Sequence, residues 1–99
     1  MEDLSRVMTS GLAHMLALEN FRDQMPVDTI RNLEPGRHRI GIHHITKGWI
    51  HGTVVQVCPN DDPFDSQVYF RDRDGRRLGC FAENIGYVVT MCSDDRTSR

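Results

Sequence analysis

The pair Asp74-Gly75 lies between two short runs of β-favouring residues, and it constrains the fold more than any other feature of the chain. The first run covers residues 67–72 and the second covers residues 76–82. A tight turn between two strands needs a residue that accepts a positive φ angle, and glycine accepts it without steric cost. The sequence therefore predicts a β-hairpin over residues 67–82.

The length of the turn decides which side chains of this hairpin share a face. A loop of two residues would set Val68 opposite Phe81. A type I turn over residues 72–75, with Gly75 as the left-handed residue of a bulge, would instead set Val68 opposite Cys80. Because side chains alternate along a strand, this one-residue difference exchanges the two faces completely.

We predict the bulged register because it separates apolar from polar side chains more cleanly. It has a cost, since it sets Arg71 opposite Arg77, and like charges across a strand pair repel. The face that this register turns to the core contains Val68, Phe70, Leu78, Cys80 and Ala82.

A period of two also runs through the chain before and after the hairpin. It predicts strands over residues 37–45, 49–58 and 87–91, with Gly52 expected to mark a bulge. Five short strands with a tight turn before the last one resemble an SH3-like small antiparallel barrel, here over residues 37–92. The resemblance is one of architecture and implies no activity.

The residues before the barrel are expected to be helical, which makes the chain α+β. Residues 3–22 show apolar side chains three and four apart, the pattern of an amphipathic helix. The helix has a weak point at Thr9-Ser10-Gly11, where Ser10 would cap a second segment if the helix is broken. Its apolar stripe either packs on the barrel or forms a homodimer or partner interface, and the candidate dimer residues are Met8, Leu12 and Met15.

Proline and glycine residues indicate where the remaining elements of the chain begin and end. Pro26 suits the first turn of a second short helix within residues 25–33. We therefore expect one domain, with a helical segment over residues 1–36, the barrel over residues 37–92 and a flexible tail over residues 93–99.

Composition limits the functional class. The chain has 99 residues, a net charge of −2 and no basic excess of the kind that a general nucleic-acid binder shows. No apolar run approaches membrane-spanning length, and the N-terminus lacks a signal-peptide pattern, so we expect a cytoplasmic protein that does not bind membranes. Three cysteines without metal-ligand spacing are expected to be reduced thiols.

No pattern in the chain indicates catalysis, a cofactor or a metal. Adjacent His43 and His44 must point to opposite faces of a strand, which leaves too few ligands for a zinc site. Cys80 falls on the predicted core face, where an apolar environment raises the pKa of a thiol. No nucleophile elbow and no glycine-rich phosphate loop is present. We therefore expect no enzyme.

The loop after the second strand is the first candidate for a binding surface. Phe64 stands there among acidic residues, as an aromatic anchor for a protein partner would. The alternative is that Phe64 folds back over the open end of the barrel. The predicted protein-binding residues are Asp61, Asp62, Phe64, Asp65 and Tyr69.

The hairpin is the second candidate, because arginines interleaved with aromatic residues hold phosphates and stack on bases. Asp72 and Asp74 on the same turn oppose this interpretation by neutralising part of the charge. The residues predicted to bind nucleic acid are Tyr69, Arg71, Arg73, Arg76 and Arg77.

The sequence thus favours a small non-enzymatic protein-binding module. Adaptors, subunits of larger assemblies and inhibitors made by mobile elements all fit that description, and no residue separates the three. The alternative function is a small nucleic-acid-binding barrel that uses the hairpin over residues 71–77.

Overall fold

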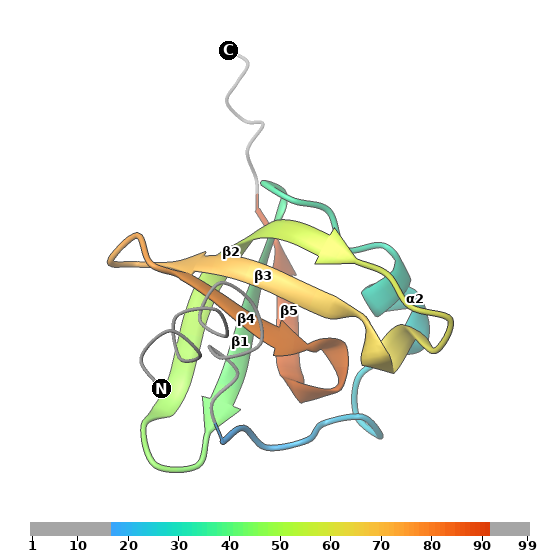
Figure 1. Cartoon of the computed structure of the whole chain (residues 1–99), viewed down its shortest axis with the longest axis horizontal. Helices are drawn as coiled ribbons and strands as arrows, with labels where there is room; N and C mark the ends of the chain where they lie inside the picture. Colours follow the sequence, from blue (N-terminus) through green and yellow to red (C-terminus); the bar gives the residue numbers. More distant parts are fainter. Residues whose placement is uncertain (1–16, 92–99) are drawn as a thin grey trace, which may run out of the picture.

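The structure is a computed structural model that describes residues 17–91, and it contains five strands, one short α-helix and two single-turn 3-10 helices (Figure 1). The strands are β1 (His38–His44), β2 (Gly48–Cys58), β3 (Gln67–Asp72), β4 (Arg77–Phe81) and β5 (Ile85–Thr90). The helices are α2 (Val27–Arg31), η2 (Pro63–Asp65) and η3 (Ala82–Asn84). None of the helices in this part of the chain is long and apolar enough to cross a membrane.

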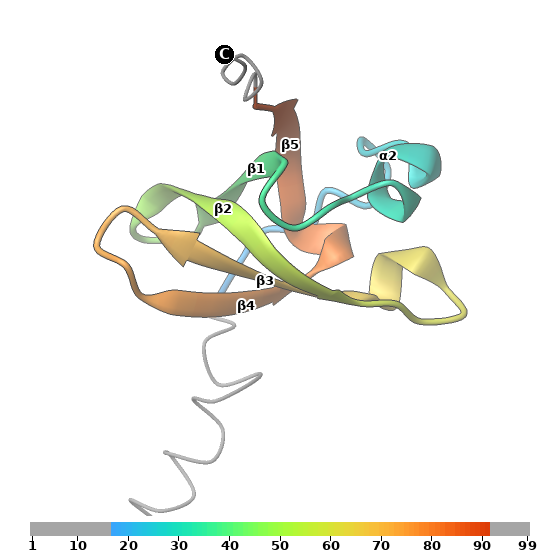
Figure 2. The same ribbon diagram turned by 90° about the horizontal axis from the view of Figure 1, so that it is seen from above.

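All five strands belong to one antiparallel sheet with the order β4-β3-β2-β1-β5. The sheet coils strongly, as Figure 2 shows from above. No ladder joins β4 to β5 among the described residues, so the prediction of a closed barrel is corrected to an open, coiled sheet. A closed barrel requires hydrogen bonds between its first and last strands, and within residues 17–91 each edge strand pairs on one side only.

The hairpin has the predicted register. Val68 pairs with Cys80, and Arg71 pairs with Arg77. Gly75 has a φ angle of 84°, and its N–H donates to the Asp72 carbonyl at 2.9 Å, as a type I turn followed by a glycine bulge requires. Cys80 is fully buried, which confirms the predicted core face.

The prediction that Gly52 marks a bulge is wrong. The irregularity in β2 lies three residues later, where the pairing moves from Val54 and Phe70 to Gln56 and Tyr69. A Cβ atom on Gly52 would lie 2.7 Å from the Arg71 carbonyl oxygen and would overlap the Phe70 ring. Glycine is therefore needed here because the neighbouring strand and a core ring approach the backbone closely.

The core fills the inside of the coiled sheet and is closed at one end by α2. The short helix predicted within residues 25–33 is α2, but Pro26 is its N-cap residue and not part of its first turn, and Ile30 is the buried residue of the helix. Strands β1, β3 and β4 send alternate apolar side chains inward, as period-two patterning predicted. The last strand begins at Ile85, two residues before the predicted start at Tyr87, and register shifts interrupt the alternation in β2 and β5. The buried hydrophobic residues are Met25, Ile30, Leu33, Ile40, Ile42, Val54, Val68, Phe70, Cys80, Ala82 and Ile85.

The residues before α2 form a segment that we call the strap, defined as residues 17–24; its first residues pair with the end of β1, and residues 22–24 form a turn. Leu18 forms a β-bridge with His44, and the N–H of Phe21 donates to the Glu83 carbonyl at 2.6 Å. The part of the predicted helix over residues 3–22 that the structure describes is therefore not helical. The remainder of that helix lies outside the described residues, and so do the candidate dimer residues Met8, Leu12 and Met15 and the predicted tail over residues 93–99.

Candidate functional site

The outer face of the sheet, which points away from the core, carries aromatic and basic side chains. Cross-strand pairing identifies its members, because His43 pairs with Trp49 and Arg39 pairs with Thr53. Alternation along each strand extends the face to the edges, where it includes Val89. No strand residue on this face is Asp or Glu. The face is thus apolar and positively charged, although the chain as a whole has a net charge of −2.

Five ring side chains meet on this face and form a cluster that we call the aromatic platform. Trp49 lies at its centre and is 46% exposed. Its ring stacks on Phe21 with centroids 5.9 Å apart and meets His43 edge-on at 5.1 Å. Tyr87 lies 5.5 Å from Trp49, and His51 stacks on the Trp49 ring at 6.4 Å. Such distances are those of favourable aromatic pairs, so the rings support one another.

Two glycines allow the platform to lie flat on the sheet. A Cβ atom on Gly86 would come within 2.6 Å of two carbons of the Trp49 ring. A Cβ atom on Gly41 would overlap the ring of Tyr87. Both rings therefore rest directly on backbone, which restricts their motion without covering their outward faces.

Polar contacts hold the rim of the platform. The hydroxyl of Tyr87 is hydrogen-bonded to Nδ1 of His51. Nδ1 of His43 is shielded from solvent and lies 3.2 Å from the Glu19 carboxylate of the strap, without hydrogen-bond geometry. The strap thus supplies Phe21 and Glu19 to a site whose other members come from β1, β2 and β5.

A row of arginines crosses the outer face next to the platform. Arg39, Thr53, Arg71 and Arg77 are successive cross-strand partners on β1, β2, β3 and β4. At a strand spacing of about 4.8 Å the row spans roughly 14 Å. None of the three arginines has a carboxylate partner within residues 17–91. The Arg77 guanidinium lies 4.9 Å from the centre of the Tyr69 ring, so Tyr69 belongs to this row.

The row and the platform meet at an open pocket of about 350 Å³ between β2 and the turn of the hairpin. The pocket combines an indole, an imidazole and two guanidinium groups with the carboxylates of the turn. Its lining residues are Arg39, Trp49, Ile50, His51, Asp72, Arg73 and Asp74.

The four hairpin arginines predicted to bind nucleic acid have different surroundings. Arg76 forms ion pairs with both Asp72 and Asp74, at 3.5 and 3.6 Å. Arg71 donates to the Gly75 carbonyl, and Arg77 bonds to Gln56. The two aspartates thus form ion pairs with the same arginine, Arg76. The Asp72 carboxylate also accepts hydrogen bonds from the N–H groups of Asp74 and Arg76 and so caps the turn.

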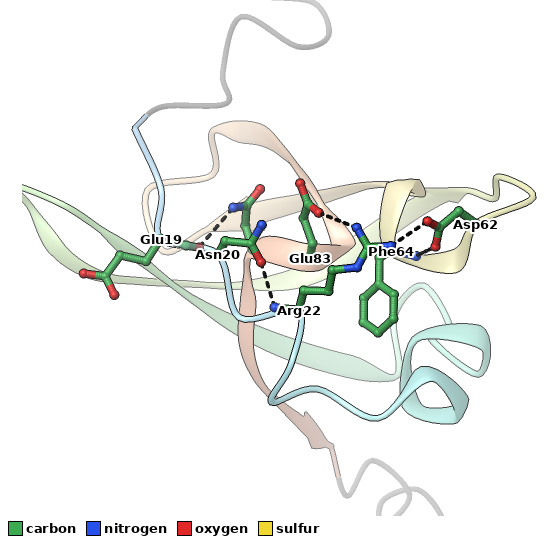
Figure 3. Close-up of polar contacts among 7 residues, drawn as sticks. Glu19, Asn20, Arg22, Asp62, Phe64 and Glu83 are labelled. Carbon is green, nitrogen blue, oxygen red and sulfur yellow. Dashed lines mark hydrogen bonds and ion pairs between the residues drawn. The ribbon is translucent and has the colours of Figure 1, made fainter.

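The acidic loop is tied to the strap by Arg22 (Figure 3). The Arg22 guanidinium lies 2.7 Å from the Asp62 carboxylate and 3.4 Å from that of Glu83, and these carboxylates raise the pKa of Arg22. It also covers the Phe64 ring, 4.9 Å from the ring centre. Phe64 is half-buried against the core, whereas Asp61 and Asp65 are exposed. The structure therefore brings the loop residues together but places Tyr69 elsewhere, on the outer face.

The cysteine and histidine side chains have surroundings that do not favour catalysis or metal binding. Burial raises the pKa of the Cys80 thiol to about 12, so this thiol stays protonated at neutral pH. His43 and His44 point to opposite faces, as predicted, and His44 is buried where its Nδ1 accepts the N–H groups of Thr46 and Lys47. Within residues 17–91 no three His, Cys, Asp or Glu side chains are grouped closely enough to hold a metal ion.

The sequence predictions did not include the aromatic platform. Part of its signal was present, because Trp49 and His51 alternate on one strand and His43 lies two residues from Gly41 on the preceding strand. Phe21 carried no such signal, since it reaches Trp49 only through the course of the strap. Comparison with protein-family models, with curated proteins and with solved structures finds no match for this chain. Its function must therefore be inferred from the outer face itself.

Proposed function

We propose that this chain is a small non-enzymatic protein-binding module whose working surface is the outer face of the sheet. The observation that carries the proposal is the exposed ring of Trp49, held on Gly86 at the centre of the aromatic platform. Tryptophan, tyrosine and arginine dominate the binding energy of protein interfaces, and this face presents all three. A rigid ring also loses little conformational freedom when a partner covers it.

The partner we propose is a protein surface with an apolar side chain surrounded by carboxylates. The apolar group would cover Trp49, and the carboxylates would face Arg39, Arg71 and Arg77. Charge complementarity favours this partner, because none of the three guanidinium groups forms an ion pair with a carboxylate within residues 17–91. Complementary charge contributes chiefly to specificity and to the rate of association.

We rank the acidic loop below the outer face as a binding surface. Arg22 already covers Phe64 and pairs with Asp62, so a partner that used Phe64 as its anchor would first have to displace the strap. Asp61 and Asp65 are exposed and remain candidates for contacts at the edge of an interface.

We also propose that the coiled sheet is an SH3-like small barrel with an open seam. The supporting features are the strand order β4-β3-β2-β1-β5 and the 3-10 helix η3 directly before the last strand. The architecture is compatible with an adaptor, a subunit of an assembly or an inhibitor, and it selects none of them.

Site-directed photo-crosslinking in the native host tests the proposal. A benzophenone amino acid replaces Thr53 on the outer face, and a matched control replaces Asp61 in the acidic loop. We expect a discrete protein adduct from position 53 that is lost when Trp49→Ala is added and kept when Ile45→Ala is added. Ile45 is a suitable control because it is an exposed apolar residue of the β1–β2 turn, 59% exposed. An adduct from position 61 alone would move the binding surface to the acidic loop.

A single-stranded nucleic acid is the second candidate ligand, and the row of arginines beside Tyr69 favours it. Bases stack on exposed rings, and guanidinium groups hold phosphates. The net charge of −2 opposes it, because a polyanion gains little long-range attraction from such a chain.

A further inference from the structure

β5 is an edge strand that lacks the usual protection against pairing with another chain. Its residues, Ile-Gly-Tyr-Val-Val-Thr, include no charge and no proline. It pairs with β1 on one side, and Figure 2 shows it at the end of the sheet. Exposed edges normally carry charged residues or proline, because an uncharged strand with unpaired backbone groups is a template for another strand.

The direction of the backbone groups follows from the ladder between β1 and β5. The N–H of Met91 donates to the Arg37 carbonyl at 2.8 Å, so Met91 points its backbone groups at β1. In an antiparallel pair alternate residues share this direction, which places Val89 with Met91. Val88 and Thr90 therefore direct their N–H and C=O groups away from β1. Within residues 17–91 the strap makes no backbone hydrogen bond to either of them, since it pairs with β1 at His44 instead.

The side chains along this edge suit a second strand. Val89 is 49% exposed on the outer face, next to the half-buried Tyr87. β-Branched and aromatic residues form the most favourable cross-strand pairs. The opposite edge differs, because β4 has five residues and begins with the exposed Arg77.

We propose that two copies of this chain associate by antiparallel pairing of their β5 strands. The occupant is a second copy because an uncharged strand meets its own copy without like-charge repulsion, and because antiparallel pairing about a two-fold axis makes one surface complementary to itself. A register with Val88 on the axis pairs residues 86–90 of one copy with the same residues of the other. Tyr87 then faces Val89 of the second copy, twice. Two five-stranded sheets become one continuous sheet.

This proposal goes beyond the proposed function and is independent of it. Pairing would bring the two aromatic platforms into one continuous surface, since Tyr87 belongs both to the platform and to the edge strand. Trp49→Ala removes the centre of the platform and leaves β5 unchanged, so it is expected to leave the association state as it was. The two proposals can therefore fail separately.

Analytical ultracentrifugation of the full chain, over a hundredfold range of concentration, gives the first test. We expect a dimer that Val89→Lys converts to a folded monomer. Each copy would then place a lysine ammonium group against the uncharged β5 strand of the other copy. Ile45→Lys is the matched control: it also replaces an exposed apolar residue by lysine, but in the β1–β2 turn, and it should leave the dimer intact. Met15→Asp should also leave the dimer intact, whereas a dimer formed through the N-terminal segment would dissociate.

Amide hydrogen exchange followed by NMR gives the second test and does not depend on any variant. The amide of Val88 should exchange more slowly as the protein concentration rises, because pairing buries it between two strands. The amide of Val89 should be protected at every concentration, because it points to β1. A wild-type chain that is monomeric throughout the range, with a Val88 amide that exchanges at a constant rate, would overturn the proposal. So would a Val89→Lys variant that dimerises as well as Ile45→Lys.

Discussion

Trp49 rests on Gly86, and the contact is close enough that no other residue type fits at position 86 without a shift. A Cβ atom there would lie 2.6 Å from Cη2 and Cζ3 of the indole and 3.3 Å from the Gly41 carbonyl oxygen. Real Cβ atoms essentially never approach this closely. Because Trp49 is the only tryptophan of the chain, its fluorescence reports this contact directly.

We therefore expect Gly86→Ala to displace the indole from the sheet. The added methyl group overlaps the ring, and relief of such overpacking costs about 1–3 kcal/mol of folding free energy. The tryptophan emission maximum should move to longer wavelength, and binding through the platform should weaken while the fold is kept. Thr90→Ala on the same strand is the control and should leave the emission unchanged. Identical emission spectra for Gly86→Ala and the wild type would contradict the contact.

The thiol of Cys80 should be inert in the folded protein. Burial holds its pKa near 12, so little thiolate forms below that pH. Iodoacetamide at pH 8 should leave Cys80 unmodified in the native state and should alkylate it fully in denaturant, as read by mass spectrometry of its peptide. The half-buried Cys58 is the internal comparison and should react first.

The same shift makes stability depend on pH at the alkaline end. The Cys80 thiol has a pKa of about 12 when folded and an ordinary value of 9.0. Above pH 9 the unfolded chain releases this proton and the folded chain does not, so unfolding becomes more favourable as the pH rises from 9 towards 12. Urea unfolding of wild type and Cys80→Ala should show a difference in unfolding free energy that is constant below pH 9 and shrinks above it. A difference that stays constant or grows above pH 9 would show that the folded chain releases the Cys80 proton at least as readily as the unfolded chain.

Phe64 is expected to contribute to stability as well as to the shape of the loop. It packs against the core and lies beneath the Arg22 guanidinium. Phe64→Ala should lower the free energy of unfolding by roughly 2 kcal/mol, about half the cost of removing a fully buried phenylalanine. For a domain of this size that corresponds to a drop of about 10 °C in melting temperature. Asp61→Ala, two residues outside η2, is the control and should melt like the wild type.

A titration with single-stranded oligonucleotides separates the two candidate ligands of the outer face. If the arginine row binds phosphates, Arg71→Ala with Arg77→Ala should weaken the complex. The log–log dependence of affinity on salt should then flatten by about 0.7 for each lost contact. We expect no such complex at low salt, because the platform is proposed to bind protein and the chain has a net charge of −2. A tight complex with a steep salt dependence would make nucleic acid the ligand.

The hairpin shows how far local sequence could predict this fold. The positions of Asp74 and Gly75 and the period of two determined its turn, its register and its buried face, because each of these depends on residues that are neighbours along the chain or directly across the turn. The short helix after Pro26 was predictable for the same reason. The role of Gly52 was not, since the Phe70 ring and Arg71 carbonyl that crowd it come from another strand.

The composition of the candidate site was less predictable from the sequence than the strands were, because its members come from segments far apart in the chain. Alternation along β1 and β2 determined that His43, Trp49 and His51 would share a face, because side chains on a strand can point in only two directions. Only the coiling of the sheet and the course of the strap decided that Phe21 would stack on Trp49, and that Arg22 would cover Phe64. These partners are separated by about 28 and 42 positions in the sequence, and at that separation a contact depends on how whole elements pack, a property that no local pattern of residues encodes.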